Sequence, residues 1–586
     1  MTGTIVGRLV ICAWLLAAPP SFAKVDIRAW LDAEAPPRMA GADVPALIVA
    51  VVHGEETIVA GYGVDAELAV FRVGSVSKPV TASVLLSLAA EGQLRLDEDV
   101  RADLTGLPIE PPLDSPLTLH QLLTHTAGFN ERLFGQHTAS SADFLPLDEY
   151  LSRHLPPRFI DPGIVIAYND HHTALAGRVA EVRARRPFAD LARELLFEPL
   201  GMHDSSFEQI DLPPHLTARL AAAYPGKGLP PYPRDYIQLP PAAGLYTTAP
   251  DMARYLRGLL SGRLPGAAQQ LAVQFRQLPE LPGRGYGFAE GRHGAQTTFY
   301  KDGQASGFNA RLLLVPDQGF GLFLAHNRSI FGPFGDVLPA GRLLRELGAD
   351  LLTALWPEPA AIVPAEEVRA DGMAAYEIDL TPYPGTYRTV IAARHTWERL
   401  ASLFDEAVVR ESGGMLQLGS RRYLPLSDEL FVNAADTGNH MGFRVVDDKA
   451  SHVFLGGGAY ERVPWWTSMA ALPWVLGIPL LGLLISAWRL LRIDTWRVLI
   501  GQLPLIAFFP GLGAVLYLVD VQRLFGGPPP VLLVLLALPL LGFTGLTLQA
   551  IRLRHSRALA RLAGLTAGLA LAIWLGYWGL LGYRLG

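Results

Sequence analysis

The stretch Ser75-Val76-Ser77-Lys78 has the residue types and spacing of a nucleophile and its base. It follows a strand-like segment and stands where a helix is expected to begin, so Ser75 and Lys78 fall on one helical face within hydrogen-bonding reach. A serine hydroxyl attacks well once a base takes its proton, and a desolvated lysine can be neutral enough to do so. Amide groups at the helix N-terminus would face a developing oxyanion. The pair predicts acyl transfer through Ser75.

The composition strengthens this prediction because lysine is scarce. Only five of the 49 lysine and arginine side chains are lysines, at positions Lys24, Lys78, Lys227, Lys301 and Lys449. Arginine is effectively never deprotonated in proteins, so a position that needs a proton-accepting amine must keep lysine. Lysine therefore stands where arginine would not serve.

Six stretches in sequence order resemble the class C β-lactamase and penicillin-binding-protein-like serine hydrolase family, over roughly residues 40 to 330. They are FRVGSVSK (Phe71 to Lys78), LTLHQLLTHTAGF (Leu117 to Phe129), YND (Tyr168 to Asp170), FEPLGMHDSSF (Phe197 to Phe207), GLYTTAPDMARYL (Gly244 to Leu256) and YKDGQASGF (Tyr300 to Phe308). The resemblance implies an α+β domain with an antiparallel sheet flanked by helices and a helical subdomain.

The resemblance also implies roles for the later motifs. Tyr168 matches the tyrosine of the family's YxN motif, which shares general-base and proton-shuttle work with the lysine. To act in this way its phenol needs a lowered pKa, which Lys78 and Lys301 together could provide.

Lys301-Asp302-Gly303 matches the third box of the family, usually KTG or HxG on a strand that borders the site. By this resemblance Lys301 supplies positive potential, and the backbone N–H groups of Ser75 and Gln304 form an oxyanion hole.

Two positions depart from the family pattern. Asp170 stands where asparagine is usual, and Asp302 replaces a threonine whose hydroxyl helps to hold a substrate carboxylate. If Asp302 points into the site it would repel a free carboxylate, which argues against efficient β-lactam turnover and carboxypeptidase action and favours neutral esters, amides or amine-bearing peptides.

Three histidines have simpler structural interpretations. His125 is expected to be a hydrogen-bonding residue, since the mechanism needs no histidine. His171 and His172 are adjacent, so their side chains are not expected to reach one metal ion, and no third ligand is evident nearby. No metal or cofactor is predicted.

The apolar character is concentrated at the two ends of the chain. Residues 1–23 read as a signal peptide, with an apolar run and a Ser21-Phe22-Ala23 cleavage site. Cys12, the sole cysteine, lies inside that run, so the mature chain would have no thiol and no disulfide. The net charge is −6 with both signs mixed, which makes nucleic acid an improbable partner.

Residues 464–586 are predicted to form four transmembrane helices. The uncharged stretches are Val463 to Trp488, Val498 to Val519, Leu524 to Ile551 and Leu562 to Tyr583. Seven arginines fall in the first and third connections, so those loops are placed in the cytoplasm and all preceding residues outside it. The signal peptide and the charge of the loops both place the residues before the helices outside the cytoplasm. The chain is therefore expected at the inner (cytoplasmic) membrane with an extracytoplasmic domain.

Two modules are expected between these ends: a hydrolase domain over residues 25–350 and a small all-β module over residues 376–463. The first mixes strand-like runs with helical segments such as Leu147 to His154, and a hairpin is expected from Ala310 to Asn327 around a Pro-Asp-Gln-Gly turn. The second consists of short alternating strands such as Met415 to Leu418. By the family resemblance the β-module borders the cleft.

The sequence therefore predicts an exported, membrane-anchored serine hydrolase that cleaves an amide or ester through an acyl-enzyme. Substrates implied by the family include cell-wall D-amino-acid peptides, β-lactams and small esters. The alternative is a catalytically weak membrane sensor or scaffold that binds peptidoglycan fragments. Retention of Ser75, Lys78, Tyr168 and Lys301 together favours the enzyme.

Overall fold

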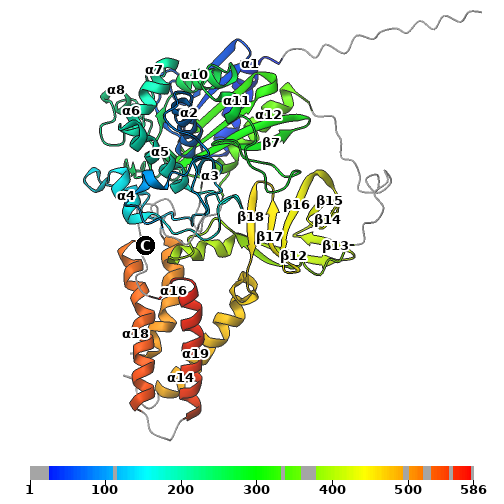
Figure 1. The fold of residues 1–586 in the computed structure, drawn as a ribbon. Helices are drawn as coiled ribbons and strands as arrows, with labels where there is room; N and C mark the ends of the chain where they lie inside the picture. The colour runs from blue at the N-terminus through cyan, green and yellow to red at the C-terminus, as the bar shows by residue number, and fades with distance from the viewer. Residues whose placement is uncertain are drawn as a thin grey trace, which may run out of the picture.

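The structure is a computed structural model of the 586-residue chain. It describes residues 25–109, 115–330, 337–357, 378–491, 501–518, 529–552 and 558–581. The predicted signal peptide and Cys12 lie outside the described residues. Figure 1 shows a mixed helix and strand region, a barrel beside it and a group of long helices that extends from both.

A six-stranded antiparallel sheet forms the centre of the first region, with strand order β2-β1-β10-β9-β8-β7. Its strands are β1 (Leu47–His53), β2 (Glu56–Tyr62), β7 (Ala289–His293), β8 (Gln296–Ala305), β9 (Phe308–Val315) and β10 (Phe320–His326). The first strand therefore pairs with the last, so both ends of this domain meet in one sheet.

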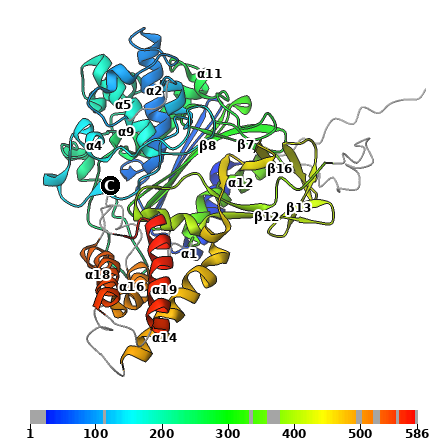
Figure 2. The ribbon, with the colours of Figure 1, turned by 60° about the horizontal axis from the view of Figure 1, so that its bottom comes forward.

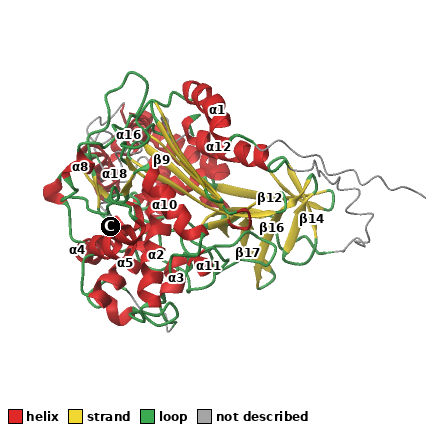
Figure 3. Ribbon diagram, turned by 90° about the horizontal axis from the view of Figure 1, so that it is seen from above, coloured by secondary structure: helices red, strands yellow, loops and turns green. Residues whose placement is uncertain are grey.

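Helices cover both faces of the sheet, which explains why β1 is apolar at nearly every position. Helices α1 (Ile27–Gly41) and α12 (Ala340–Leu355) cover one face, and their apolar residues recur every three or four positions. The other face carries α2 (Ser77–Ala90), α5 (Asp170–Ala184) and α10 (Ala249–Leu260), as Figure 3 shows from above. This is the α+β arrangement that the sequence predicted.

Helix α2 lies at the centre of the helical side. Every residue from Ser77 to Leu88 is buried, and its apolar residues show no single preferred face. A helix that is enclosed on all sides holds its first turn rigidly, and that turn carries Lys78. The packing around α2 thus holds in place the end of the proposed site that carries Lys78.

A closed eight-stranded antiparallel barrel follows the region built on the six-stranded sheet. Its strands are β11 (Gly385–Thr389), β12 (Glu406–Ser412), β13 (Met415–Leu418), β14 (Arg421–Pro425), β15 (Leu430–Asn433), β16 (Asp436–Val446), β17 (Lys449–Leu455) and β18 (Gly458–Arg462). Inward residues such as Tyr387, Phe431 and Phe443 form its core. Closure leaves no free edge strand, which stabilises such short strands.

Four apolar helices end the described chain: α14 (Ile478–Leu491), α16 (Leu503–Leu518), α18 (Pro530–Arg552) and α19 (Ala558–Tyr577). Figures 1 and 2 show them side by side below the other two regions. Among the described residues, two helices are long and apolar enough to cross a membrane, Met469–Arg489 and Pro530–Leu548. Leu503–Val515 and Gly564–Tyr577 are shorter apolar helices.

The limits of the first and last of these helices differ from the prediction. Residues after Val463 form short helical turns near Pro464 and Pro473. The apolar helical span that contains α14 therefore begins at Met469, not at Val463. The last helix ends at Tyr577 because Gly579 adopts a left-handed conformation (φ 68°). There the backbone of Thr396 approaches so closely that a Cβ on Gly579 would clash at 2.8 Å.

Candidate active site

Two glycines allow strand β8 to approach the turn that carries Ser75. Gly74 has a φ of 50°, and a Cβ there would lie 2.1 Å from the carbonyl oxygen of Gln304. A Cβ on Gly303 would lie 2.0 Å from the oxygen of Val73 and 3.0 Å from the nitrogen of Ser75. The sequence predicted Gly303 as part of the third box, and its steric role is to admit the Ser75 backbone.

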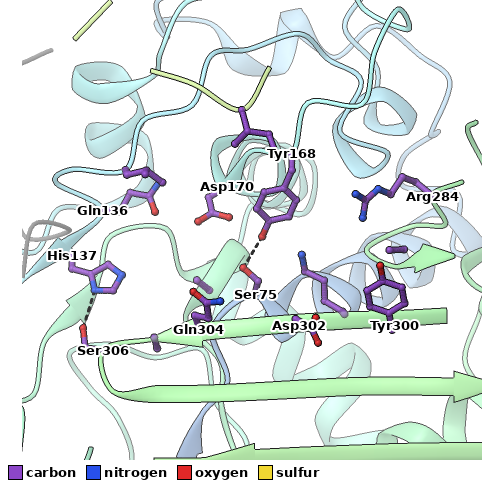
Figure 4. A pocket seen from close by; sticks show the side chains of 16 residues that line it. Ser75, Gln136, His137, Tyr168, Asp170, Arg284, Tyr300, Asp302, Gln304 and Ser306 are labelled. Carbon is purple, nitrogen blue, oxygen red and sulfur yellow. Dashed lines mark hydrogen bonds between the residues drawn. The ribbon is translucent and has the colours of Figure 1, made fainter. Parts of the chain in front are cut away.

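Ser75 lies in the 3-10 turn Gly74–Val76 (η1), directly before α2. Its Oγ is 2.6 Å from the hydroxyl of Tyr168 (Figure 4). The same oxygen is 3.0 Å from Nζ of Lys78. The structure thus brings together the three residues that the sequence predicted as catalytic. A hydroxyl between an amine and a phenol can lose a proton to one and receive one from the other.

Lys78 is almost fully enclosed, with 1% of its surface exposed. Its Nζ donates to Asp170 Oδ1 at 2.5 Å and to the carbonyl oxygen of Ala242 at 2.9 Å. Burial lowers the pKa of Lys78 from its ordinary value, and the charge of Asp170 opposes this shift. Burial alone would raise the pKa of Asp170, but Lys78 holds it below its ordinary value. Asp170 therefore orients the amine.

A second buried carboxyl lies close to this pair. Glu131 is 4% exposed, and its Oε1 accepts a hydrogen bond from the backbone of Arg132 at 2.8 Å. Burial, and then the charge of Asp170, raise the pKa of Glu131 well above its ordinary value. The pKa values of the two acids thus shift in opposite directions, and Asp170 is the more readily ionised of the pair. Sequence reasoning missed Glu131, which has no motif of its own.

Tyr168 differs from the expectation in its protonation. Burial, and then the charge of Asp170, raise the pKa of its phenol well above 10, whereas the sequence argument required a lowered value. The Nζ atoms of Lys301 and Lys78 lie 4.0 and 4.9 Å from the ring centroid, but the two lysines do not outweigh the effect of burial on the pKa of Tyr168. Tyr168 is therefore a proton donor in the resting site.

Asp302 also differs from the expectation, because its carboxylate points away from Ser75 (Figure 4). Alternation along β8 places Lys301 on the site face and Asp302 on the opposite face. The carboxylate pairs there with Nη1 of Arg311 at 2.6 Å and is 40% exposed. Asp302 thus borders the pocket, but its charge is paired with Arg311 and is not directed at Ser75, as the predicted repulsion of a substrate carboxylate requires.

The three histidines lie behind the site. His125 has a positive φ of 60°, and its Nδ1 accepts a weak hydrogen bond from the backbone of Asn169 at 3.4 Å. Its ring packs against Tyr168 at 4.6 Å, and burial lowers its pKa well below the ordinary value, so it is neutral. His171 packs on Tyr150 and His172 on His125, so the adjacent pair faces different neighbours.

A pocket of about 430 Å³ opens over Ser75. It is bordered by Tyr168, Asp170, Lys301 and Gln304, and by residues that the sequence did not indicate: Leu133, Gln136, His137, Arg284, Ser306 and Ile391. Ile391 follows the first barrel strand, so the barrel region forms part of the wall. These positions come from several distant segments of the chain, and no local pattern in the sequence marks them.

His137 and Ser306 form a polar group at one side of the pocket. Asp235 accepts hydrogen bonds from Ser306 at 2.6 Å and from His137 at 2.8 Å, and it also pairs with the buried Arg72. Arg72 and His137 hold the pKa of Asp235 below its ordinary value although burial opposes them. This network fixes the polar side chains of His137 and Ser306 at the wall of the pocket.

Comparison with known proteins agrees with this geometry. The family model described as Beta-lactamase matches residues 31–345, more than half of the chain. Penicillin-binding protein 4 of Amycolatopsis lactamdurans is 29% identical over 350 residues, which cover 54% of this chain and 84% of that protein. D-alanyl-D-alanine-carboxypeptidase/endopeptidase AmpH of Escherichia coli (strain K12) is 23% identical, covering 49% and 81%.

A solved structure extends the likeness in fold beyond the family model. The crystal structure of SurE aligns with a TM-score of 0.52 and 21% identity, covering 74% of this chain and 99% of that one. With the family match and the site geometry, these findings show that the chain belongs to the beta-lactamase family. It is a serine hydrolase of the β-lactamase, D-Ala-D-Ala peptidase and esterase type.

Proposed function

We propose that Ser75 attacks an amide or ester carbonyl and forms an acyl-enzyme, which water then resolves. The hydrogen bonds of Ser75 to Lys78 and Tyr168, at 3.0 and 2.6 Å, carry this proposal. The backbone N–H groups of Ser75 and Gln304 hold the oxyanion, and the close approach allowed by Gly303 supports this role.

The directions of the pKa shifts indicate which group gives and which group takes each proton. Lys78, with its lowered pKa, takes the proton of Ser75 Oγ as the C–O bond to the substrate forms. The ammonium is then stabilised by Asp170. Tyr168, which keeps its proton at rest, donates it to the leaving group and is reprotonated from Lys78. In deacylation a water replaces the leaving group and the same path runs in reverse.

We further propose that the enzyme is exported and held at the inner membrane with its site outside the cytoplasm. The two helices with sufficient length and apolarity support anchoring. The arginine-rich first and third loops predicted from the sequence support the orientation. The substrates are small amides or esters, including cell-wall D-amino-acid peptides or β-lactam-like compounds.

Covalent labelling of the full chain with a fluorophosphonate or a fluorescent penicillin tests the mechanism. The unmodified chain is expected to be labelled, Ser75→Ala is expected to lose the label, and Ser152→Ala on the exposed face of α4 (Leu147–His154) keeps it. A folded but unlabelled wild-type chain would instead favour the membrane sensor that binds peptidoglycan fragments without cleaving them.

A further inference from the structure

The wall of the pocket over Ser75 is polar except at two positions. Leu133 and Ile391 are the aliphatic residues larger than alanine among the described residues that line it. Apart from three alanines, every other described lining residue carries a hydroxyl, amide, imidazole, amine, guanidinium or carboxylate group. Ile391 is 41% exposed, so this apolar part of the wall is open. An open apolar surface at the edge of a polar pocket indicates a ligand with an apolar part.

Leu133 and Ile391 belong to one part of the wall. The backbone N–H of Glu131 donates to the carbonyl oxygen of Ala392 at 3.2 Å, which joins the two segments. Leu133 is also held by Glu398 of the connection between β11 and β12, whose Oε2 accepts its N–H at 2.7 Å. Ile391 lies in the same connection. The apolar part of the pocket wall is therefore built on the barrel connection.

The same connection meets the ends of the apolar helices. It includes the 3-10 helix Trp397–Phe404 (η7), which Figure 1 shows in yellow-green across the upper ends of α16 and α19. Arg399 Nη1 donates to the carbonyl oxygen of Tyr577, the last residue of α19, at 3.0 Å. Directly after the connection, Oε2 of Glu406 accepts the N–H of Met469, where the first apolar span begins, at 3.0 Å. With the chain anchored as proposed, the connection lies at the outer surface of the bilayer.

Exposed aromatic rings mark the same level. Phe404, at the end of η7, is 76% exposed, and Trp465, in the turn before the first apolar span, is 69% exposed. Aromatic rings are enriched where membrane and water meet. The two rings fit the headgroup region of the outer leaflet, and Ile391 lies in the same connection as Phe404.

We propose that the substrate is an amphiphile of the outer leaflet, with its amide or ester bond at Ser75 and its alkyl chain along Leu133 and Ile391 to the bilayer. This deepens the proposed function and rests on it, because the anchor sets the height of the pocket above the bilayer. The scissile bond lies among polar residues while the chain stays in lipid, so the chain does not have to enter water. Long-chain amides and esters are therefore preferred to short ones.

Labelling rates with two alkyl fluorophosphonates test this preference on the full chain in phosphatidylcholine nanodiscs. One probe carries an ethyl group on phosphorus and the other a dodecyl group, and in each Ser75 Oγ forms a bond to phosphorus while fluoride leaves. Mass spectrometry follows the phosphonylated chain. The dodecyl probe is expected to label at least tenfold faster, because burial of a few methylene groups accounts for such a ratio.

Two variants at isoleucines of equal exposure separate the pocket wall from simple partitioning of the probe into lipid. Ile391→Asn should lower the ratio of the two labelling rates at least fivefold. Ile210→Asn should keep the ratio, because Ile210 is 40% exposed but lies outside the pocket lining. It precedes α8 (Pro214–Thr217), which Figure 1 shows far from the apolar helices.

The height of the wall is measured without any reaction at Ser75. In a full-length Ser75→Ala chain, bimane on Ile391→Cys should be quenched by a headgroup-nitroxide lipid at least twofold more than bimane on Ile210→Cys. Adding N-dodecanoyl glycinamide should change the emission of the label on Ile391→Cys, and N-acetyl glycinamide should not.

A wild-type ratio of labelling rates near one, or an unchanged ratio in Ile391→Asn, would overturn the amphiphilic substrate. Equal quenching at the two labelled positions would overturn the placement of the wall at the bilayer. Failure of the proposed function shows separately, because a chain that neither fluorophosphonate labels forms no acyl-enzyme. The bimane measurements on Ser75→Ala then decide by themselves whether the wall binds an alkyl chain at the membrane surface.

Discussion

The ring of Phe134 stacks on Trp397 with centroids 4.6 Å apart and planes 14° from parallel. Phe134 follows Leu133, which borders the pocket, whereas Trp397 lies in the connection between β11 and β12 of the barrel. Trp397 also packs in one apolar cluster with Phe508 and Trp578 near the C-terminal helices. The rim of the site, the barrel connection and the helices therefore share one core.

We expect this stacked pair to couple the stability of the three regions. Phe134→Leu and Trp397→Leu should each lower the free energy of unfolding, and the double variant should lose less than their sum. A coupling of about 1 kcal/mol is expected because stacked aromatic pairs contribute this much beyond their buried area. Thermal unfolding of the detergent-solubilised chain measures it, and strict additivity would contradict it.

A matched control uses aromatic pairs within one region. Phe188→Leu with Phe207→Leu, in edge contact at 5.0 Å inside the hydrolase domain, should show a similar coupling. Only the Phe134 and Trp397 variants are expected to change kcat/KM, since they adjoin Leu133 at the pocket. An equal effect of both pairs on kcat/KM would show that the rim is not specifically affected.

Glu398, in the connection between β11 and β12, makes the stability of the folded chain sensitive to pH. Its Oε2 accepts the backbone N–H of Leu133 at 2.7 Å, and burial raises its pKa to about 7 from an ordinary 4.5. The folded state thus binds this proton more tightly than the unfolded state does. Stability is highest below about pH 4.5 and falls as pH rises to about 7, by roughly 3 kcal/mol from this group.

Glu398→Gln should remove this part of the pH dependence while keeping an acceptor for Leu133. Unfolding midpoints between pH 4.5 and 8 measure the effect, with Glu411→Gln on β12 as an exposed control that leaves the profile unchanged. A wild-type profile that matches Glu398→Gln across this interval would show that folding does not raise the pKa of Glu398.

The sequence predicted those parts of the fold and site that local patterns encode. The helix expected at Leu147 to His154 and the strand at Met415 to Leu418 have the same limits in the structure. The hairpin expected around a Pro-Asp-Gln-Gly turn is β9 and β10. Ser75 and Lys78 are close because helical spacing alone places them so.

Contacts between distant segments could not be predicted in this way. The direction of Asp302 depends on the alternation of β8 and on Arg311 of the neighbouring strand, and the pKa of Tyr168 depends on burial by several elements. Arg284 gains its place through a carbonyl 173 positions later in the chain. Such relations follow from tertiary packing, which one sequence does not display.

Asp170→Asn tests the role of its carboxylate beside Lys78. Removing the negative charge removes the interaction that favours the ammonium, so the pKa of Lys78 should fall further. The ascending limb of kcat/KM against pH, measured on a neutral ester, should therefore move to lower pH. An unmoved limb, or one at higher pH, would mean that Lys78 is not the base.

Asp302→Asn makes the same change of charge on the opposite face of β8. Because its carboxylate pairs with Arg311 and is 40% exposed, we expect less than a threefold change in kcat/KM and an unmoved pH profile. The stability cost should be at most about 1 kcal/mol, as for other exposed ion pairs. A large gain with carboxylate substrates would show that Asp302 does act on the site.

The proposed orientation in the membrane can be tested with single cysteines, because the sole cysteine, Cys12, lies in the predicted signal peptide and is expected to be removed with it. Ser152→Cys on the exposed face of α4 should react with an impermeant maleimide in intact spheroplasts. Arg489→Cys, at the end of α14 and in the loop predicted to be cytoplasmic, should react only after permeabilisation.

The two positions respond in opposite ways if the orientation is wrong, so each serves as the control for the other. Labelling of Arg489→Cys but not Ser152→Cys in intact spheroplasts would invert the topology and place the pocket in the cytoplasm. Labelling of both would mean that the chain does not cross the bilayer between them. A protected Arg489→Cys beside an accessible Ser152→Cys requires that α14 spans the membrane, because the segment between Arg462 and Arg489 is uncharged and long enough.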